Sequence, residues 1–131
     1  MKDLSIGSAI DIAHGVHMPR LGLGTYKSTP DEAARDAVVE ALRLGYRSID
    51  TASLYGNEEG VGEGMRLSGV PRDDIFLTTK VWNEEQGYDT TLEAIERSLT
   101  RLGTIKTARA GAINTAKRCC TTACPYTKDS A

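Results

Sequence analysis

The first 103 residues contain no cysteine, and the sequence as a whole has no long apolar run. A membrane-spanning helix needs about 18 or more consecutive apolar residues. The N-terminus also lacks the uninterrupted apolar core of a signal peptide. With 40% apolar residues and a net charge of only −2, the chain does not have the composition of a disordered protein. We therefore expect a globular, cytoplasmic protein that makes no contact with a membrane.

The three cysteines lie close together near the C-terminus, as Cys119, Cys120 and Cys124. Adjacent cysteines rarely share a tetrahedral metal site, and no further cysteine or histidine follows that would supply a fourth ligand. The sequence therefore predicts no metal site, and we interpret the thiols as incidental.

The chain changes character at Thr104. Residues 1–103 carry 11 Lys or Arg and 17 Asp or Glu, whereas residues 104–131 carry 5 and 1, and the latter contain no Leu, Val, Met, Phe or Trp. Such a segment buries too little apolar surface to offset the entropy of ordering it. We expect one folded part, residues 1–103, followed by an irregular, poorly structured tail, residues 104–131, whose abrupt start resembles a frameshift or an alternative exon.

Hydrophobic periodicity predicts a hairpin followed by three strand-helix units. Apolar and polar residues alternate from Ile10 to Met18 around a turn at His14-Gly15. The strands expected next are Leu21–Thr25, which should be buried, Tyr46–Asp50 and Ile75–Lys80. Alternating strands and helices predict a parallel sheet, either doubly wound or closed as a barrel, and the pattern alone does not choose between them.

The helices have recognisable starts and ends. Thr29, Pro30 and Glu32 match an N-cap, a first helical residue and a capping box, and Gly45 should end that helix. A second helix, about Asn57–Ser68, contains three glycines, which indicate close backbone packing rather than intrinsic helicity. In the third helix, Thr90 and Glu93 could cap the start and Gly103 the end, and the apolar stripe consists of Leu92, Ile95, Leu99 and Leu102.

Three polar residues fall at or just after predicted strand ends: Asp50, Tyr55 and Lys80. Functional groups of parallel α/β proteins gather at this edge of the sheet. A phenol with a pKa of about 10 is a reluctant acid at neutral pH, but a neighbouring ammonium favours the phenolate, and a carboxylate would hold that ammonium in place. The trio would thus suit carbonyl reduction, in which tyrosine protonates the oxygen as hydride reaches the carbon.

A plainer interpretation of the same residues is a structural ion pair beside a half-buried aromatic, and spacing alone favours it. Gly22-x-Gly24 is too short for a dinucleotide-binding fingerprint, because no third glycine follows before a helix. A Rossmann fold is therefore disfavoured.

Three ordered segments, MPRLGLGTY, GYRSIDTASLYGNEEGVGEGMR and LTTKVWNEEQGYDTTLEAIERSL, resemble the aldo-keto reductase superfamily. The resemblance covers about residues 10–103, and KVWNEEQGYDTTL is similar to bacterial-type members that reduce glyoxal, methylglyoxal or diketo-gluconate. It implies part of a (β/α)₈ TIM barrel whose bottom is plugged by the hairpin and whose top holds NADPH.

By the same resemblance, Asp50, Tyr55 and Lys80 match three members of the catalytic tetrad. Gly24, Thr25, Tyr26 and Asp50 would line the nicotinamide end of the cofactor, and Tyr26, Tyr55 and Trp82 would wall the substrate pocket. Core or rim packing is the alternative for Tyr26 and for Trp82.

The sequence departs from the family after the third helix. The tetrad histidine belongs at the end of a fourth strand, where residues 104–109 read TIKTAR, and the only histidines, His14 and His17, lie in the hairpin. Strands four to eight, with the loops that grip the rest of the cofactor, are also missing. The resemblance therefore implies a truncated NADPH-dependent reductase of aldehydes or ketones that is inactive by itself.

Two alternatives differ in class. A non-enzymatic fragment would act through its exposed sheet edge, by self-association or by binding a partner, whereas full-length family members are often monomeric. Nucleic-acid binding by the basic tail is disfavoured, because five dispersed basic residues without an aromatic platform form a poor site.

Overall fold

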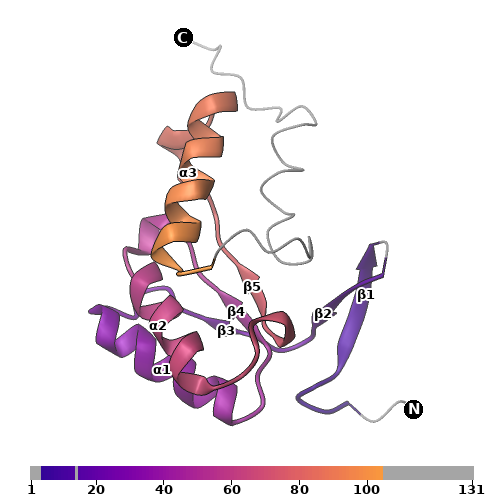
Figure 1. The fold of residues 1–131 in the computed structure, drawn as a ribbon. Coiled ribbons are helices and arrows are strands. Elements are labelled where there is room, and N and C mark those ends of the chain that lie inside the picture. The colour runs from indigo at the N-terminus through magenta and orange to yellow at the C-terminus, as the bar shows by residue number, and fades with distance from the viewer. Residues whose placement is uncertain (1–3, 14, 105–131) are drawn as a thin grey trace.

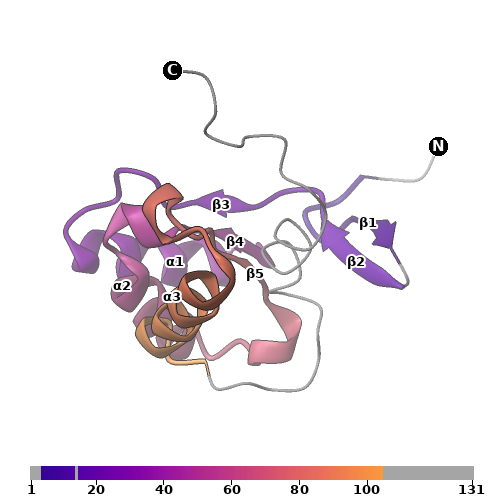
Figure 2. The ribbon, with the colours of Figure 1, turned by 90° about the horizontal axis from the view of Figure 1, so that it is seen from above.

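The computed structural model describes residues 4–13 and 15–104, which form a hairpin, a three-stranded sheet and three helices (Figure 1). Figures 1 and 2 both show the helices on one side of the sheet and the hairpin apart from the helices. Of the predicted tail, only Thr104 lies among the described residues, and Cys119, Cys120 and Cys124 lie outside them. Within the described part, no helix has both the length and the apolar character that crossing a membrane requires.

The hairpin is confirmed. β1 (Ala9–Ala13) pairs antiparallel with β2 (Val16–Pro19), with Ile10 opposite Met18. The segment before it approaches the start of β4, because a Cβ on Gly45 would lie 3.3 Å from the Ile6 side chain. The hairpin is thereby placed at the end of the sheet where the parallel strands begin.

The three predicted strand-helix units are also present, and their strands pair in parallel in the order β3-β4-β5. In chain order the elements are β3 (Leu23–Gly24), α1 (Asp31–Arg43), β4 (Ser48–Asp50), η1 (Ser53–Tyr55), α2 (Glu58–Ser68), η2 (Arg72–Asp74), β5 (Phe76–Thr78), η3 (Asn83–Glu85) and α3 (Tyr88–Arg101). The strands are shorter than predicted, and the prediction of a buried first strand is wrong, since Leu21 is 50% exposed and lies outside β3.

The arrangement of the helices separates the two fold classes that the sequence left open. The strand order follows the chain without a reversal, and all three helices cover the same face of the sheet (Figure 2). A doubly wound sheet reverses its strand order and carries helices on both faces. The described residues therefore have the architecture of a barrel segment.

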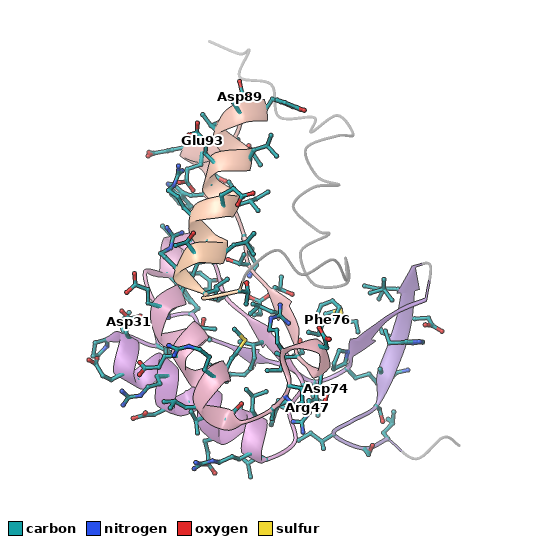
Figure 3. The ribbon with its side chains drawn as sticks, in the orientation of Figure 1. Asp31, Arg47, Asp74, Phe76, Asp89 and Glu93 are labelled. Carbon is teal, nitrogen blue, oxygen red and sulfur yellow. The ribbon has the colours of Figure 1, made fainter. Side chains whose placement is uncertain are left out.

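The core lies between the helices and the sheet. Ile49 of β4 and Leu77 of β5 are buried against Val38, Val61 and their neighbours. Because side chains alternate along a strand, Asp50, Phe76 and Thr78 point to the opposite face. Figure 3 shows Phe76 on the side of β5 that is turned away from the helices.

The glycines of α2 allow it to lie close to its neighbours, as predicted. A Cβ on Gly60 would collide with the Asp31 carbonyl oxygen, and one on Gly62 with the Leu102 carbonyl oxygen. One on Gly64 would lie 2.6 Å from the Arg35 carbonyl oxygen. α2 therefore packs backbone to backbone against both α1 and the end of α3.

Both predicted capping boxes are wrong. Neither Thr29 nor any other side chain caps α1, which begins at Asp31. α3 begins at Tyr88, two residues before the predicted Thr90 cap, and instead Thr91 Oγ1 accepts a hydrogen bond from the Gly87 N–H, at 3.2 Å.

The predictions for the C-terminal ends of α1 and α3, and for the apolar stripe of α3, agree better with the structure than the capping predictions do. Gly45 and Gly103, with φ of 100° and 63°, follow their helices as expected. In the stripe of α3, Ile95 and Leu99 are buried, whereas Leu92 is 41% exposed.

Candidate functional site

Parallel pairing brings the three strand ends to one edge of the sheet. Gly24, Asp50 and Thr78 are neighbours across β3, β4 and β5. The loops that follow them carry Tyr26, Tyr55 and Lys80. Residues far apart in the sequence thus converge on this edge, as the strand-end rule predicts.

An ion pair forms the centre of this edge. Lys80 Nζ donates a hydrogen bond to Asp50 Oδ1 and a second one, of 3.2 Å, to the Thr51 carbonyl oxygen. The Lys80 carbonyl in turn accepts from both the N–H and the hydroxyl of Ser53, each at 3.1 Å. The two charged side chains are 49% and 44% exposed. The ammonium is therefore fixed in position and still accessible to a ligand.

Tyr55 lies against this ion pair. Lys80 Nζ is 5.5 Å from the centroid of the Tyr55 ring, which is within cation–π range. Tyr26 packs on Tyr55, with ring centroids 5.0 Å apart and the planes inclined by 51°. The structure thus brings together Asp50, Tyr55, Lys80 and Tyr26.

The residues expected around the cofactor differ in accessibility. Gly24 is exposed, and a Cβ there would meet no atom within 4 Å, so its backbone is open to a ligand. Thr25 is fully buried, and its N–H and hydroxyl both donate to the Asp50 carbonyl, at 3.0 and 3.3 Å. The Thr25 side chain is thus buried behind the edge, where its hydroxyl is bonded to the Asp50 backbone.

Trp82 lies two residues beyond Lys80, immediately before η3, and is 37% exposed. Tyr26, at 63% exposed, is more open. Across the portion of the chain that the structure describes, the indole makes no ring contact with Tyr26 or Tyr55. Trp82 therefore borders the edge without joining the cluster.

Two buried polar residues at this edge are absent from the sequence-based prediction. Asn57 is fully buried, and its side-chain amide donates to the carbonyls of Thr25 and Ser28, at 2.8 and 2.9 Å. Glu58 is 1% exposed and bonds to both Thr79 and Arg101. An Asn-Glu pair at a helix start has the sequence signature of an exposed first turn, so only its tertiary partners reveal its burial.

The histidines lie elsewhere or outside the described residues. His17 Nδ1 is 2.6 Å from Asp11 Oδ1 in the exposed hairpin, and the position of His14 is not described. Among residues 4–13 and 15–104, no three His, Cys, Asp or Glu side chains cluster in a way that would hold a metal ion.

Comparison with known proteins gives a consistent family. The sequence model of the Aldo/keto reductase family matches residues 20–108. Glyoxal reductase of Bacillus subtilis (strain 168) is 52% identical over 98 residues, which make up 75% of this chain and 36% of that protein. The chain spans about a third of the length of the curated relatives it matches.

Solved structures agree. An aldo/keto reductase from Brucella melitensis is 52% identical with a TM-score of 0.71, and the match covers 74% of this chain and 38% of that one. A Bombyx mori aldo-keto reductase in complex with NADP is 36% identical, also with a TM-score of 0.71, and covers 77% of this chain and 36% of that one.

Proposed function

Since the chain belongs to the aldo/keto reductase family, we propose that the edge formed by Asp50, Tyr55 and Lys80 is the proton-donating part of a site that reduces aldehydes or ketones to alcohols with NADPH. The fold supports this proposal, because the described residues form the N-terminal hairpin and first three strand-helix units of a (β/α)₈ barrel. The proposed site lies at the carboxyl ends of the strands, where active sites of this fold occur.

The observation that carries the proposal is the position of the Lys80 ammonium, held by Asp50 and lying 5.5 Å from the Tyr55 ring centroid. Tyr55 would donate its hydroxyl proton to the carbonyl oxygen of the substrate as that oxygen gains negative charge. The ammonium would stabilise the phenolate left on Tyr55. Asp50 would hold the ammonium in place through the ion pair, so each member of the trio has a separate role.

The residues present fit the nicotinamide end of a dinucleotide. The open backbone at Gly24, the exposed Tyr26 ring and the accessible Asp50 carboxylate would hold it. Thr25 would contribute by supporting Asp50. When bound, NADPH would supply the hydride for the reduction, and a Bombyx mori relative has been crystallised with NADP.

The substrate would be a small carbonyl compound. Tyr26 and Tyr55 would wall its pocket on one side, and Trp82, which stands apart in the structure, would border it on the other. Aromatic walls suit a neutral aldehyde or ketone, because they exclude water without placing a charge beside the carbonyl carbon. The Bacillus subtilis relative is named a glyoxal reductase, which is consistent with a small aldehyde.

A chimera tests the proposal. Residues 1–103 are joined to the remaining part of Bacillus subtilis glyoxal reductase, and turnover of glyoxal with NADPH is measured for the parent and for Tyr55→Phe. This substitution removes only the hydroxyl. We expect turnover to fall by ~10²–10⁴-fold, the usual contribution of general acid catalysis, with NADPH affinity almost unchanged.

Tyr46→Phe is the matched control. Tyr46 is half-buried like Tyr55, but it precedes β4 and lies at the opposite end of the strand. Near-parental turnover in the Tyr55 variant, or an equal loss in a folded Tyr46 variant, would show that Tyr55 is not the acid.

A further inference from the structure

Asn57 is a fully buried amide whose side chain makes three hydrogen bonds to two different loops. Its Nδ2 donates to the Thr25 carbonyl at 2.8 Å and to the Ser28 carbonyl at 2.9 Å. Its Oδ1 accepts from the Thr51 hydroxyl at 3.2 Å. The side chain therefore links the segment after β3, the end of β4 and the start of α2.

The two carbonyls that Asn57 holds enclose the turn that carries Tyr26. Within that turn the Ser28 N–H donates to the Thr25 carbonyl at 3.1 Å, and Lys27 adopts a left-handed conformation with φ of 62°. A left-handed lysine is strained relative to a glycine there. The hydrogen bonds from Asn57 to both ends of the turn would offset this strain and fix the direction of the Tyr26 ring.

Helix capping does not account for this amide. Asn57 occupies the N-cap position of α2, where its side chain would ordinarily accept a hydrogen bond from an N–H of the first turn. The Asn57 side chain makes no such bond, and its hydrogen bonds to Thr25, Ser28 and Thr51 all run back to the loops. Asn57 also follows Tyr55 by only two residues, so it joins the loop of one ring to the loop of the other.

We propose that Asn57 is a positioning residue whose amide holds the Tyr26 turn so that the Tyr26 ring packs against Tyr55 and forms one wall of the substrate pocket. The assignment of that wall as a substrate wall rests on the proposed reductase function, whereas the ring placement itself does not. Without the two donor bonds, the Ser28 carbonyl loses the Asn57 amide and the Thr25 carbonyl keeps only the Ser28 N–H. The exposed Tyr26 ring would then leave the position in which it is 5.0 Å from Tyr55.

The test is nuclear magnetic resonance of the full 131-residue chain with isotope-labelled tyrosine, each ring being assigned through its Tyr→Phe variant. We expect a through-space cross-peak between the Tyr26 and Tyr55 rings in the parent chain. Asn57→Asp keeps the side-chain shape but turns a carboxylate oxygen toward the two carbonyls, and it should abolish the cross-peak while the core methyl shifts of Ile49 and Leu77 stay in place. Asn83→Asp, an exposed position in η3, is the matched control and should retain it.

Asn57→Ala, which removes the donors without adding charge, is the second variant. A folded variant of either kind that keeps the Tyr26–Tyr55 cross-peak would overturn the proposal, as would a parent chain without that cross-peak. If both variants lose the Ile49 and Leu77 shifts, Asn57 maintains the whole fold rather than the Tyr26 turn, and the proposal is again wrong. Because no turnover is measured, failure of this test is distinct from failure of the assignment of Tyr55 as the acid.

Discussion

Thr79 and Lys80 are adjacent in the chain, yet each contacts a different ion pair. On one side, Lys80 pairs with Asp50, and both side chains are nearly half exposed. On the other, Thr79 Oγ1 donates at 2.6 Å to Glu58, whose carboxylate is buried and also bound by Arg101 at 2.6–2.7 Å. Alternation along an extended chain sends the two neighbouring residues to opposite sides.

This difference in burial suggests different roles: the Lys80–Asp50 pair is accessible to a ligand, whereas the Arg101–Glu58 pair stabilises the fold. A buried charge is costly unless it is paired and hydrogen-bonded, so the partners of Glu58 are needed to keep α2, α3 and the end of β5 together. The Lys80–Asp50 pair remains in contact with solvent, so its loss should cost little stability. Its accessibility is what a reacting carbonyl would require.

The largest expected effect is on the buried pair. Arg101→Met in the chimera keeps much of the side-chain volume but leaves Glu58 with only the Thr79 hydroxyl. It should lower the free energy of unfolding by about 3 kcal/mol, the low end for a buried pair, because the Arg101 side chain is itself 34% exposed. Urea denaturation measures this. A loss below about 1 kcal/mol, the range of surface pairs, would contradict the distinction between the two pairs.

The exposed pair should respond in the opposite way. Lys80→Met should change the free energy of unfolding by no more than about 1 kcal/mol, because Asp50 regains water. Turnover of the chimera should nevertheless fall roughly 10²-fold or more, because the Tyr55 phenolate loses its ammonium. Denaturation and steady-state kinetics on one preparation give both numbers, and a stable variant with parental turnover would remove Lys80 from the proposed site.

A third prediction concerns the close approach that lets Arg101 reach Glu58. Gly62→Ala places a methyl group against the Leu102 carbonyl and should destabilise the chimera by about 1–3 kcal/mol, although alanine is the better helix former. Glu59→Ala, an exposed position of α2, is the control and should be neutral or slightly stabilising. Equal unfolding midpoints for the two variants would show that α3 can move away at no cost.

The smallest effect is expected at a third ion pair, between Glu85 of η3 and Arg97 of α3, at 2.7 Å. The hydrogen bond from Arg97 lowers the pKa of Glu85 below its ordinary value. A depressed carboxyl pKa stabilises the fold above the unfolded-state pKa, and this contribution disappears as the pH falls through the folded-state pKa. Glu85→Gln should cost at most about 0.5 kcal/mol at pH 7, since Arg97 is half exposed, and nothing in acid below both pKa values.

Unfolding midpoints of the parent and the Glu85 variant, compared across that pH range, check this prediction. A difference that grows on acidification would have the wrong sign and would exclude the ion pair as its source.

Predictions based on periodicity succeeded where side-chain spacing reports burial directly. The alternation around Ile10 and Met18 predicted the hairpin, and the spacing of Ile95 and Leu99 predicted the buried face of α3. Capping predictions failed because the relevant polar groups bind neighbouring elements. Asp31, in the first turn of α1, accepts a hydrogen bond from the Gly60 N–H of α2 at 3.0 Å, a contact that no local pattern encodes.

The candidate site could be predicted only in part, because some of its contacts follow from strand pairing and others from tertiary packing. Strand ends and residue chemistry indicated Asp50, Tyr55 and Lys80, and the structure brings them together because parallel pairing places such ends side by side. Spacing alone favoured a structural ion pair, and the family resemblance was needed to suggest chemistry. The burial of Thr25 and its bond to the Asp50 carbonyl were not predictable, since they depend on how the chain pairs after β3.

The sequence by itself determined the order of strands and helices, the family motifs and the residue types available for chemistry, because these depend on local spacing. Tertiary structure alone decided which charges remain in water. Lys80 and Glu58 are both ionisable residues beside a strand end, and only the packing of α2 against α3 buries one and leaves the other accessible. Burial depends on contacts between residues distant in sequence, such as Glu58 and Arg101, and those contacts exist only once the helices have packed on the sheet.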